Sequence, residues 1–332
     1  MYRKLLLLAP IVSKKIIDYN IKSLQGFGQF YFSMKIFNQS IWSALIISCL
    51  ATSCTEEYEV TPDLNEYRKL ELDFSSLPEL GYNFVYEGWI TVNDSAISTG
   101  IFKGNENGNA TRKSFLLNID DLTNATNFIV TIEPFPDNNP FPSATHIMGG
   151  NFNEDVADLT IGHSSGFNTD FLSADGSFIL ATPTNEDETS SDEKSGIWWL
   201  DPTGPSASLE LPELTTGWNY EGWVVIDGTP VSTGTFTQVD QMDENNKYGG
   251  ILPSPEFPGE DFLFHAPDGL NFPVDLSGST AVISIEPNPD NDPAPFDLKP
   301  LVGSIPVDAN EHTSYPMENN ISNSTPTGVA SR

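Results

Sequence analysis

An internal duplication is the feature that most limits what this chain can fold into. Tyr-Glu-Gly-Trp at 86–89 returns at 220–223, and Ser-Thr-Gly-x-Phe at 98–102 returns at 232–236, so both motifs repeat at an offset of 134 residues. Ile-Glu-Pro at 132–134 returns at 285–287, an offset of 153, because the second copy carries an insertion. This period is far longer than the roughly 20–50 residues of solenoids and propellers. Each copy is therefore expected to be a domain with its own core, unfolding as a separate unit.

Each copy has the sequence pattern of β-strands. Residues 70–74 alternate apolar and polar side chains, and residues 84–92 are rich in the aromatic and β-branched residues that strands favour. Asn-Asp-Ser at 93–95 and Asp-Gly at 227–228 interrupt these runs at equivalent places, as hairpin turns do. The chain also has 25 Pro and 25 Gly, and no long helix-period run follows Cys54. The fold class predicted is all-β, with antiparallel sheets.

The acidic segment 183–194 separates the two copies. It is too polar to pack, so it is either a linker or the tip of a hairpin in which strands 177–182 and 197–200 pair. We expect a first domain at 68–183 and a second at 195–315. Residues 316–332 are rich in Asn, Ser and Thr and are predicted to be a disordered tail.

Charge excludes one class of partner. The formal charge is −31, and six of the 15 basic residues precede Cys54 together with one of the 46 acidic residues. The rest of the chain therefore carries 9 − 45 = −36. Nucleic acid binding depends on Lys and Arg at phosphates, so nucleic acid is not an expected partner. A solvated acidic surface or cation binding fits this excess better.

The N-terminal region resembles a bacterial export signal. A basic residue at Lys35 precedes an apolar run at 41–47, which is too short to span a bilayer, and small residues follow up to Cys54. Residues 50–54 resemble a lipobox, and Ile-Ile-Ser-Cys at 46–49 is a competing one. The acidic segment after Cys54 is similar to the tethers of outer-membrane lipoproteins of Bacteroidetes-type bacteria. We therefore predict a leader and signal peptide at 1–53, with a true start at Met34 as one alternative, lipidation of Cys54, and an acidic tether at 54–67.

The repeated motifs resemble the C-terminal domain of the anti-sigma-K factor (RskA) family. The second copy matches through Tyr220, Trp223, Pro230, Val231, Ser232, Gly234, Phe236, Glu286 and Pro287, whereas the first copy has Ala96-Ile97 in place of Pro-Val. The resemblance implies two tandem antiparallel β-sandwich domains outside the cytoplasmic membrane. It does not imply sigma-factor binding, because the cytoplasmic segment of the family has no counterpart here.

Paired carboxylates and one serine motif are the candidates for catalysis. Glu87 with Glu133, and Glu221 with Glu286, could act as the two carboxylates of a glycoside hydrolase. Their equal places in both copies favour a duplicated structural hydrogen bond instead. Gly-His-Ser-Ser-Gly at 162–166 fits the nucleophile-elbow pattern, but no amphipathic helix follows, so it is predicted to be a turn. No catalytic residue is assigned.

Two tryptophans and four loop residues are the candidates for binding. Trp89 and Trp223 are expected in the core, but the adjacent Trp198 and Trp199 point to opposite strand faces, so one should be exposed or at the domain interface as a ligand contact. Asp137, Asn139, Asp290 and Asp292 offer the hard oxygens that calcium prefers, although Asx turns explain them equally well. No other cofactor is expected, and the four His residues lack zinc-ligand spacing.

The sequence thus predicts a noncatalytic, lipid-anchored protein of the cell envelope with a binding, sensing or structural role. It would be an outer-membrane lipoprotein, periplasmic or surface-exposed, with an envelope protein or a glycan as partner. The alternative is an envelope hydrolase or carbohydrate-binding lipoprotein that uses exposed Trp and paired Glu.

Overall fold

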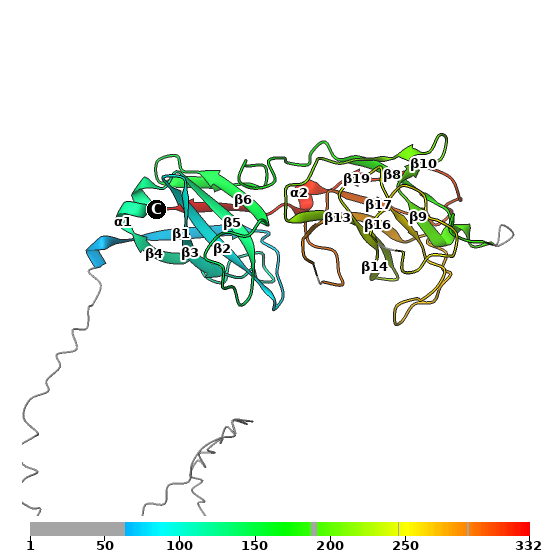
Figure 1. Cartoon of the computed structure of the whole chain (residues 1–332), viewed down its shortest axis with the longest axis horizontal. Helices are drawn as coiled ribbons and strands as arrows, with labels where there is room; N and C mark the ends of the chain where they lie inside the picture. Colours follow the sequence, from blue (N-terminus) through cyan, green and yellow to red (C-terminus); the bar gives the residue numbers. More distant parts are fainter. Residues whose placement is uncertain (1–63, 187–190, 245, 291) are drawn as a thin grey trace, which may run out of the picture. The chain divides into compact units, whose positions relative to one another are not determined.

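A computed structural model describes residues 64–186, 191–244, 246–290 and 292–332 (Figure 1). The predicted leader, both candidate lipidation sites, Cys49 and Cys54, and nearly all of the predicted tether lie outside these residues. Among the described residues, no helix has the length and apolar content needed to cross a membrane. A short 3-10 helix, η1 (Leu64–Glu66), precedes the first strand, β1 (Tyr67–Ser75), which begins at the last residue of the predicted tether.

The first copy of the repeat forms a four-stranded antiparallel sheet. Its order is β3-β2-β5-β6, made of β2 (Phe84–Val92), β3 (Ser95–Phe102), β5 (Asn127–Pro134) and β6 (His146–Asn151). The β2–β3 turn is made by Asn93 and Asp94, whose φ angles of 49° and 60° are those of a two-residue hairpin. Gly88 pairs with Gly100, and the register shifts immediately after Gly88.

The second copy repeats this arrangement. The sheet order is β14-β13-β16-β17-β19, made of β13 (Trp218–Ile226), β14 (Thr229–Phe236), β16 (Thr280–Pro287), β17 (Leu301–Ser304) and β19 (Glu318–Asn319). Gly222 pairs with Gly234 and the register again shifts after Gly222. A buried tyrosine hydroxyl in each copy, of Tyr86 and Tyr220, donates to the carbonyl of Pro78 and Pro212 respectively. The duplication therefore extends to strand pairing and to side-chain hydrogen bonds.

A second sheet accompanies the first copy and includes the last strand of the chain. Its order is β4-β1-β20-β7, with β4 (Ser114–Asn118), β7 (Val156–Leu159) and β20 (Thr327–Ser331). The expectation of a disordered tail at 316–332 was wrong, because β20 pairs with β1 on one side and β7 on the other (Figure 1). Two short helices, α1 (Ile119–Asn124) and α2 (Ile321–Ser324), are the α-helices of the described residues.

The second copy has additional short strands. A sheet of order β12-β8-β9-β15, with β18 also paired to β8, contains β8 (Asp175–Leu180), β9 (Gly196–Trp198), β12 (Leu209–Glu210), β15 (Gly259–Asp261) and β18 (Tyr315–Pro316). The 3-10 helix η2 (Glu193–Ser195) precedes β9, and β10 (Leu200–Asp201) pairs with β11 (Ser206–Ala207).

This sheet shifts the predicted domain boundary. Strand β8 pairs with β9 through Ile179 and Trp198, so the acidic segment joins a hairpin, one of the two predicted alternatives. The segment at 175–180 therefore belongs with the second copy, and the expected end of the first domain at residue 183 lies too late.

The core joins both copies. Trp89 and Trp223 are 1% and 2% exposed, as predicted for core residues. One connected cluster of buried side chains contains residues of both copies. The rings of Phe167 and Trp218 lie 4.6 Å apart between centroids, and the Trp218 indole donates to the carbonyl of His146. The described residues thus form one compact, all-β unit in which the buried side chains of the two copies are continuous.

Candidate functional site

Each copy holds a buried chain of hydrogen bonds that ends on a glutamate. In the first copy the indole of Trp89 donates to Thr131 Oγ1 at 2.9 Å, and Thr131 donates to Glu133 Oε1. The backbone N–H of Ser143 donates to the same oxygen at 2.8 Å. Glu133 is 1% exposed, so its carboxylate fixes the loop after β5 from inside the protein.

The second copy builds the same chain from slightly different residues. The indole of Trp223 donates to Ser284 Oγ at 2.8 Å, and Ser284 donates to Glu286 Oε1. The backbone N–H of Phe296 also donates to Glu286 Oε1, at 2.8 Å. The prediction of a duplicated structural hydrogen bond is therefore confirmed for this glutamate pair.

A second glutamate lies beside each chain on the neighbouring strand. Glu87 accepts a hydrogen bond from Ser98, and Glu221 accepts one from Ser232. In the register of β13 and β16, Asn219 pairs with Glu286. Glu221, two residues further along β13, therefore lies on the same face of the sheet as Glu286.

In the second copy a third carboxylate completes an acidic group. Oxygens of Glu221, Glu286 and Asp290 all lie within 4.8 Å of one another. They line a cavity of about 460 Å³, here called the acidic pocket, which is lined by Asn219, Glu221, Thr235, Glu244, Glu286, Pro287, Asn288, Pro289, Asp290, Asp292 and Pro293. From the sequence, these glutamates and this aspartate were candidates for separate sites, so their proximity was not predicted. The shared Ile-Glu-Pro-x-Pro-Asp spacing was the available signal, because it places Asp290 four residues after Glu286.

Burial dominates the electrostatics of the acidic pocket. It raises the pKa of Glu221 to about 7 and that of Glu286 to about 8, and the negative charge of Asp290 adds to both increases. The hydrogen bond from Ser232 partly opposes the rise in the pKa of Glu221. Glu286 Oε2 is fully buried and has no hydrogen-bond partner among the described residues. The pocket thus brings three carboxylates together, and one buried oxygen of Glu286 among them has no hydrogen-bond partner among the described residues.

The four predicted calcium ligands form Asx turns. The backbone N–H of Asn139 donates to Asp137 Oδ1 at 2.8 Å, and that of Asp292 donates to Asp290 Oδ1 at 2.9 Å. Asn139 and Asp292 accept from Phe141 and Ala294 in the same way. Asx turns were the alternative to calcium binding that the sequence left open for these four residues. Of the four residues, Asp290 is the one that the structure brings to the glutamate pair.

Of the two alternatives expected for Trp198 and Trp199, exposure at the surface was wrong, and no observation tests a place at a domain interface. Trp198 is 1% exposed and Trp199 is 0% exposed. The two side chains do lie in different clusters, as opposite strand faces require, but both faces are covered. The Trp198 indole donates to Asp261 Oδ1 at 2.7 Å, and the Trp199 indole lies 3.4 Å from Met317 Sδ. Neither side chain offers a surface contact.

The serine motif at 162–166 lies on a turn, as predicted. The N–H of Gly166 donates to the carbonyl of His163 at 2.8 Å, and the N–H of Ser165 donates to His163 Nδ1 at 3.1 Å. The imidazole is therefore used to close the turn.

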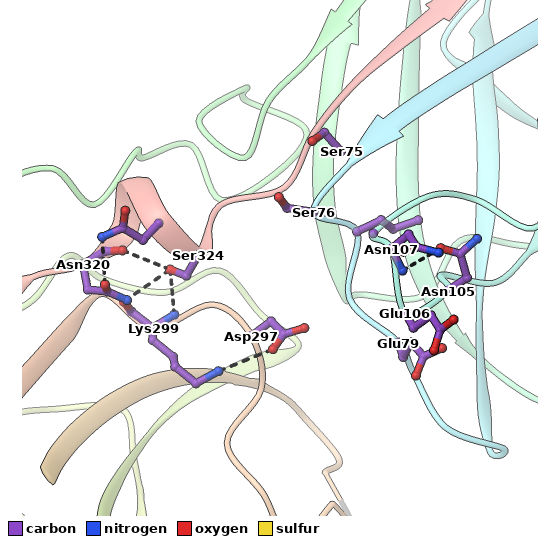
Figure 2. A pocket seen from close by; sticks show the side chains of 13 residues that line it. Ser75, Ser76, Glu79, Asn105, Glu106, Asn107, Asp297, Lys299, Asn320 and Ser324 are labelled. Atoms are coloured by element: carbon purple, nitrogen blue, oxygen red, sulfur yellow. Dashed lines mark hydrogen bonds and ion pairs between the residues drawn. The ribbon is translucent and has the colours of Figure 1, made fainter.

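A larger polar pocket of about 770 Å³ takes residues from both copies (Figure 2). Figure 2 shows Glu79 and 105–107 on one side, with Lys299 and Ser324 on the other. Its lysine is engaged within the second copy: Lys299 Nζ lies 3.5 Å from Asp297 Oδ1, and the N–H of Lys299 donates to Ser324 Oγ. We assign no ligand to this pocket.

Comparison of the chain with models of protein families, with curated proteins and with solved structures finds no match.

Proposed function

We propose that this chain is a noncatalytic, lipid-anchored binding module of the bacterial cell envelope, built from two β-sandwich domains of the type found at the C terminus of RskA-family proteins. The observation that carries the proposal is the duplicated Trp–hydroxyl–Glu chain. A glycoside hydrolase presents its two carboxylates to a sugar across an open cleft. Here Glu133 and Glu286 are each 1% exposed and accept hydrogen bonds from a loop N–H, which supports a structural use.

Substitution of Cys54 and Cys49 tests which cysteine carries the proposed lipid anchor. Metabolic labelling with a fatty acid analogue should label the full chain and the Cys49→Ala variant, whereas Cys54→Ala should lose the label. Cys49→Ala is the matched control because it lies five residues upstream in the competing lipobox. Loss of label in Cys49→Ala, with label retained in Cys54→Ala, would overturn the assignment. Protease treatment of intact cells then distinguishes a surface location from a periplasmic one.

The alternative is an envelope hydrolase or carbohydrate-binding lipoprotein that uses exposed Trp and paired Glu. The burial of Trp198 and Trp199 does not support its tryptophan surface. A serine-directed activity probe that labels the full chain but not Ser164→Ala would restore the hydrolase alternative. Absence of labelling in both proteins is the outcome expected for a noncatalytic module.

A further inference from the structure

We propose that the acidic pocket binds one divalent cation of the calcium class through Glu221, Glu286 and Asp290. The proposal is independent of the lipid anchor and of any envelope partner, because it concerns side chains within the second copy alone. It differs from the calcium expectation raised by the sequence, in which paired loop residues of both copies were the ligands.

The spacing of the oxygens fits one ion. Calcium–oxygen distances of about 2.3–2.6 Å allow two oxygens on one ion to lie at most about 5 Å apart. The three carboxylates already offer oxygens within 4.8 Å of one another. All three are hard oxygen ligands, which favour calcium or magnesium over zinc and copper. Water would supply the remaining positions of a shell of six to eight oxygens.

Glu286 supplies the observation that points to a ligand. Its Oε1 accepts from Ser284 and from the N–H of Phe296, but its buried Oε2 has no partner among the described residues. A buried carboxylate oxygen without a partner is costly, and two further carboxylates beside it add repulsion when all three are ionised. A cation in the pocket would satisfy this oxygen and offset the repulsion together.

The lining of the acidic pocket favours a cation. Besides the three proposed ligands it includes the carboxylates of Glu244 and Asp292, and none of its described lining residues is Lys or Arg. Asp290 is partly exposed, so the pocket has an entrance from solvent. A site of this kind needs an entry path as well as ligands.

The first copy is an internal comparison. Glu87, Glu133 and Asp137 occupy the equivalent positions, but among the described residues only the second-copy group has its three oxygens within the stated spacing. The first copy also has a lysine at its repeated motif, since Lys103 Nζ lies 5.8 Å from the ring of Phe135, which stands between Glu133 and Asp137 in the sequence. The equivalent of Lys103 in the second copy is the neutral Thr237. We therefore expect one site per chain.

Terbium luminescence tests the site. The full chain is purified in detergent, treated with a chelator and held at about 0.15 M salt, which screens diffuse binding to the acidic surface. Excitation of tryptophan should then produce terbium emission, because Trp223 is joined to Glu286 through the hydroxyl of Ser284. Calcium chloride should displace the terbium with a stoichiometry of one. Magnesium chloride should compete roughly tenfold more weakly or worse, because Mg²⁺ needs near-ideal octahedral geometry.

Charge-neutral variants identify the ligands. Glu286→Gln and Asp290→Asn keep an acceptor oxygen for their present hydrogen bonds, and each should weaken calcium binding roughly tenfold or more. The matched first-copy variants, Glu133→Gln and Asp137→Asn, should leave the affinity unchanged. Calcium should also raise the melting temperature of the unmodified chain but not that of Glu286→Gln.

Four results would contradict the proposed cation site. Absence of saturable binding, two equal sites per chain, equal competition by calcium and magnesium, or unchanged affinity in both second-copy variants would each overturn the proposal. Circular dichroism checks that each variant is folded. If Glu286→Gln loses its β spectrum, Asp290→Asn alone decides, because its Asx turn survives the substitution.

Discussion

Trp198→Phe should destabilise the protein more than Trp199→Phe, although the two residues are adjacent and equally buried. Each substitution keeps a six-membered ring in the core and removes one indole N–H. For Trp198 that N–H donates to Asp261 Oδ1 at 2.7 Å, and Asp261 is 0% exposed. For Trp199 the acceptor is the thioether of Met317 at 3.4 Å, which is a weak acceptor.

The difference in unfolding free energy between the two variants depends on the group that accepts the indole hydrogen bond. A hydrogen bond to a charged group contributes about 1.5–3 kcal/mol, whereas one to a thioether contributes little. Burial raises the pKa of Asp261 to about 6, so the measurement belongs at pH about 8, where the carboxylate is charged in the folded protein. Trp198→Phe should therefore lower the free energy of unfolding by about 1.5–3 kcal/mol more than Trp199→Phe does.

Urea unfolding monitored by circular dichroism measures both values, and the shared loss of one tryptophan makes the two variants a matched pair. In a double-mutant cycle, the excess cost of Trp198→Phe should shrink when Asp261 is replaced by Asn. Equal costs for the two variants, or an excess that persists in the Asp261→Asn background, would refute the assignment of this difference to the indole–carboxylate hydrogen bond.

Three further substitutions test packing. Gly222→Ala should lower the urea midpoint strongly, because its added Cβ would lie 2.5 Å from the ring of Trp199, whereas Gly204→Ala, which faces open space, should leave the midpoint unchanged; equal effects would contradict the structure. Ala330→Asp places a charge at a fully buried position of β20 and should make the first-copy sheets sensitive to limited proteolysis, so unchanged resistance would argue against the pairing of β20. Tyr86→Phe should cost about 1 kcal/mol of unfolding free energy by losing its buried hydroxyl bond, and no measurable change in urea unfolding would count against that bond.

The sequence predicted the parts of the fold that repeat or that carry strong local patterns. The strand at 84–92 and its equivalent at 218–226 are aromatic and β-branched, and each is followed by a turn whose residues tolerate positive φ. These features depend on neighbouring residues, so they can be read directly from the order of the amino acids.

The parts that could not be predicted depend on distant partners. Strand β20 is five residues of Thr, Gly, Val, Ala and Ser, with no strong strand pattern, and it is stabilised by pairing with β1, more than 250 residues earlier in the chain. The burial of Trp198 and Trp199 also depends on residues distant in the sequence. Alternation correctly placed them on opposite faces, but only the tertiary structure shows that the face of Trp198 is also covered, with Phe257 packed against its cluster. The acidic pocket likewise needs the loop after β16 to turn back toward β13.

The place of β20 between β1 and β7 has a consequence for the order in which the protein can fold during synthesis. A chain that emerges from its N-terminal side presents β1 and β7 early, but the strand that joins them arrives only after residues 160–326. Until then both strands keep unpaired edges, which are templates for wrong pairing between chains. The strands of the second copy are all synthesised before β20, so the second copy can complete its sheets first. A chaperone that shields β1 and β7 during this interval would therefore matter more to the yield of this protein than to its final stability.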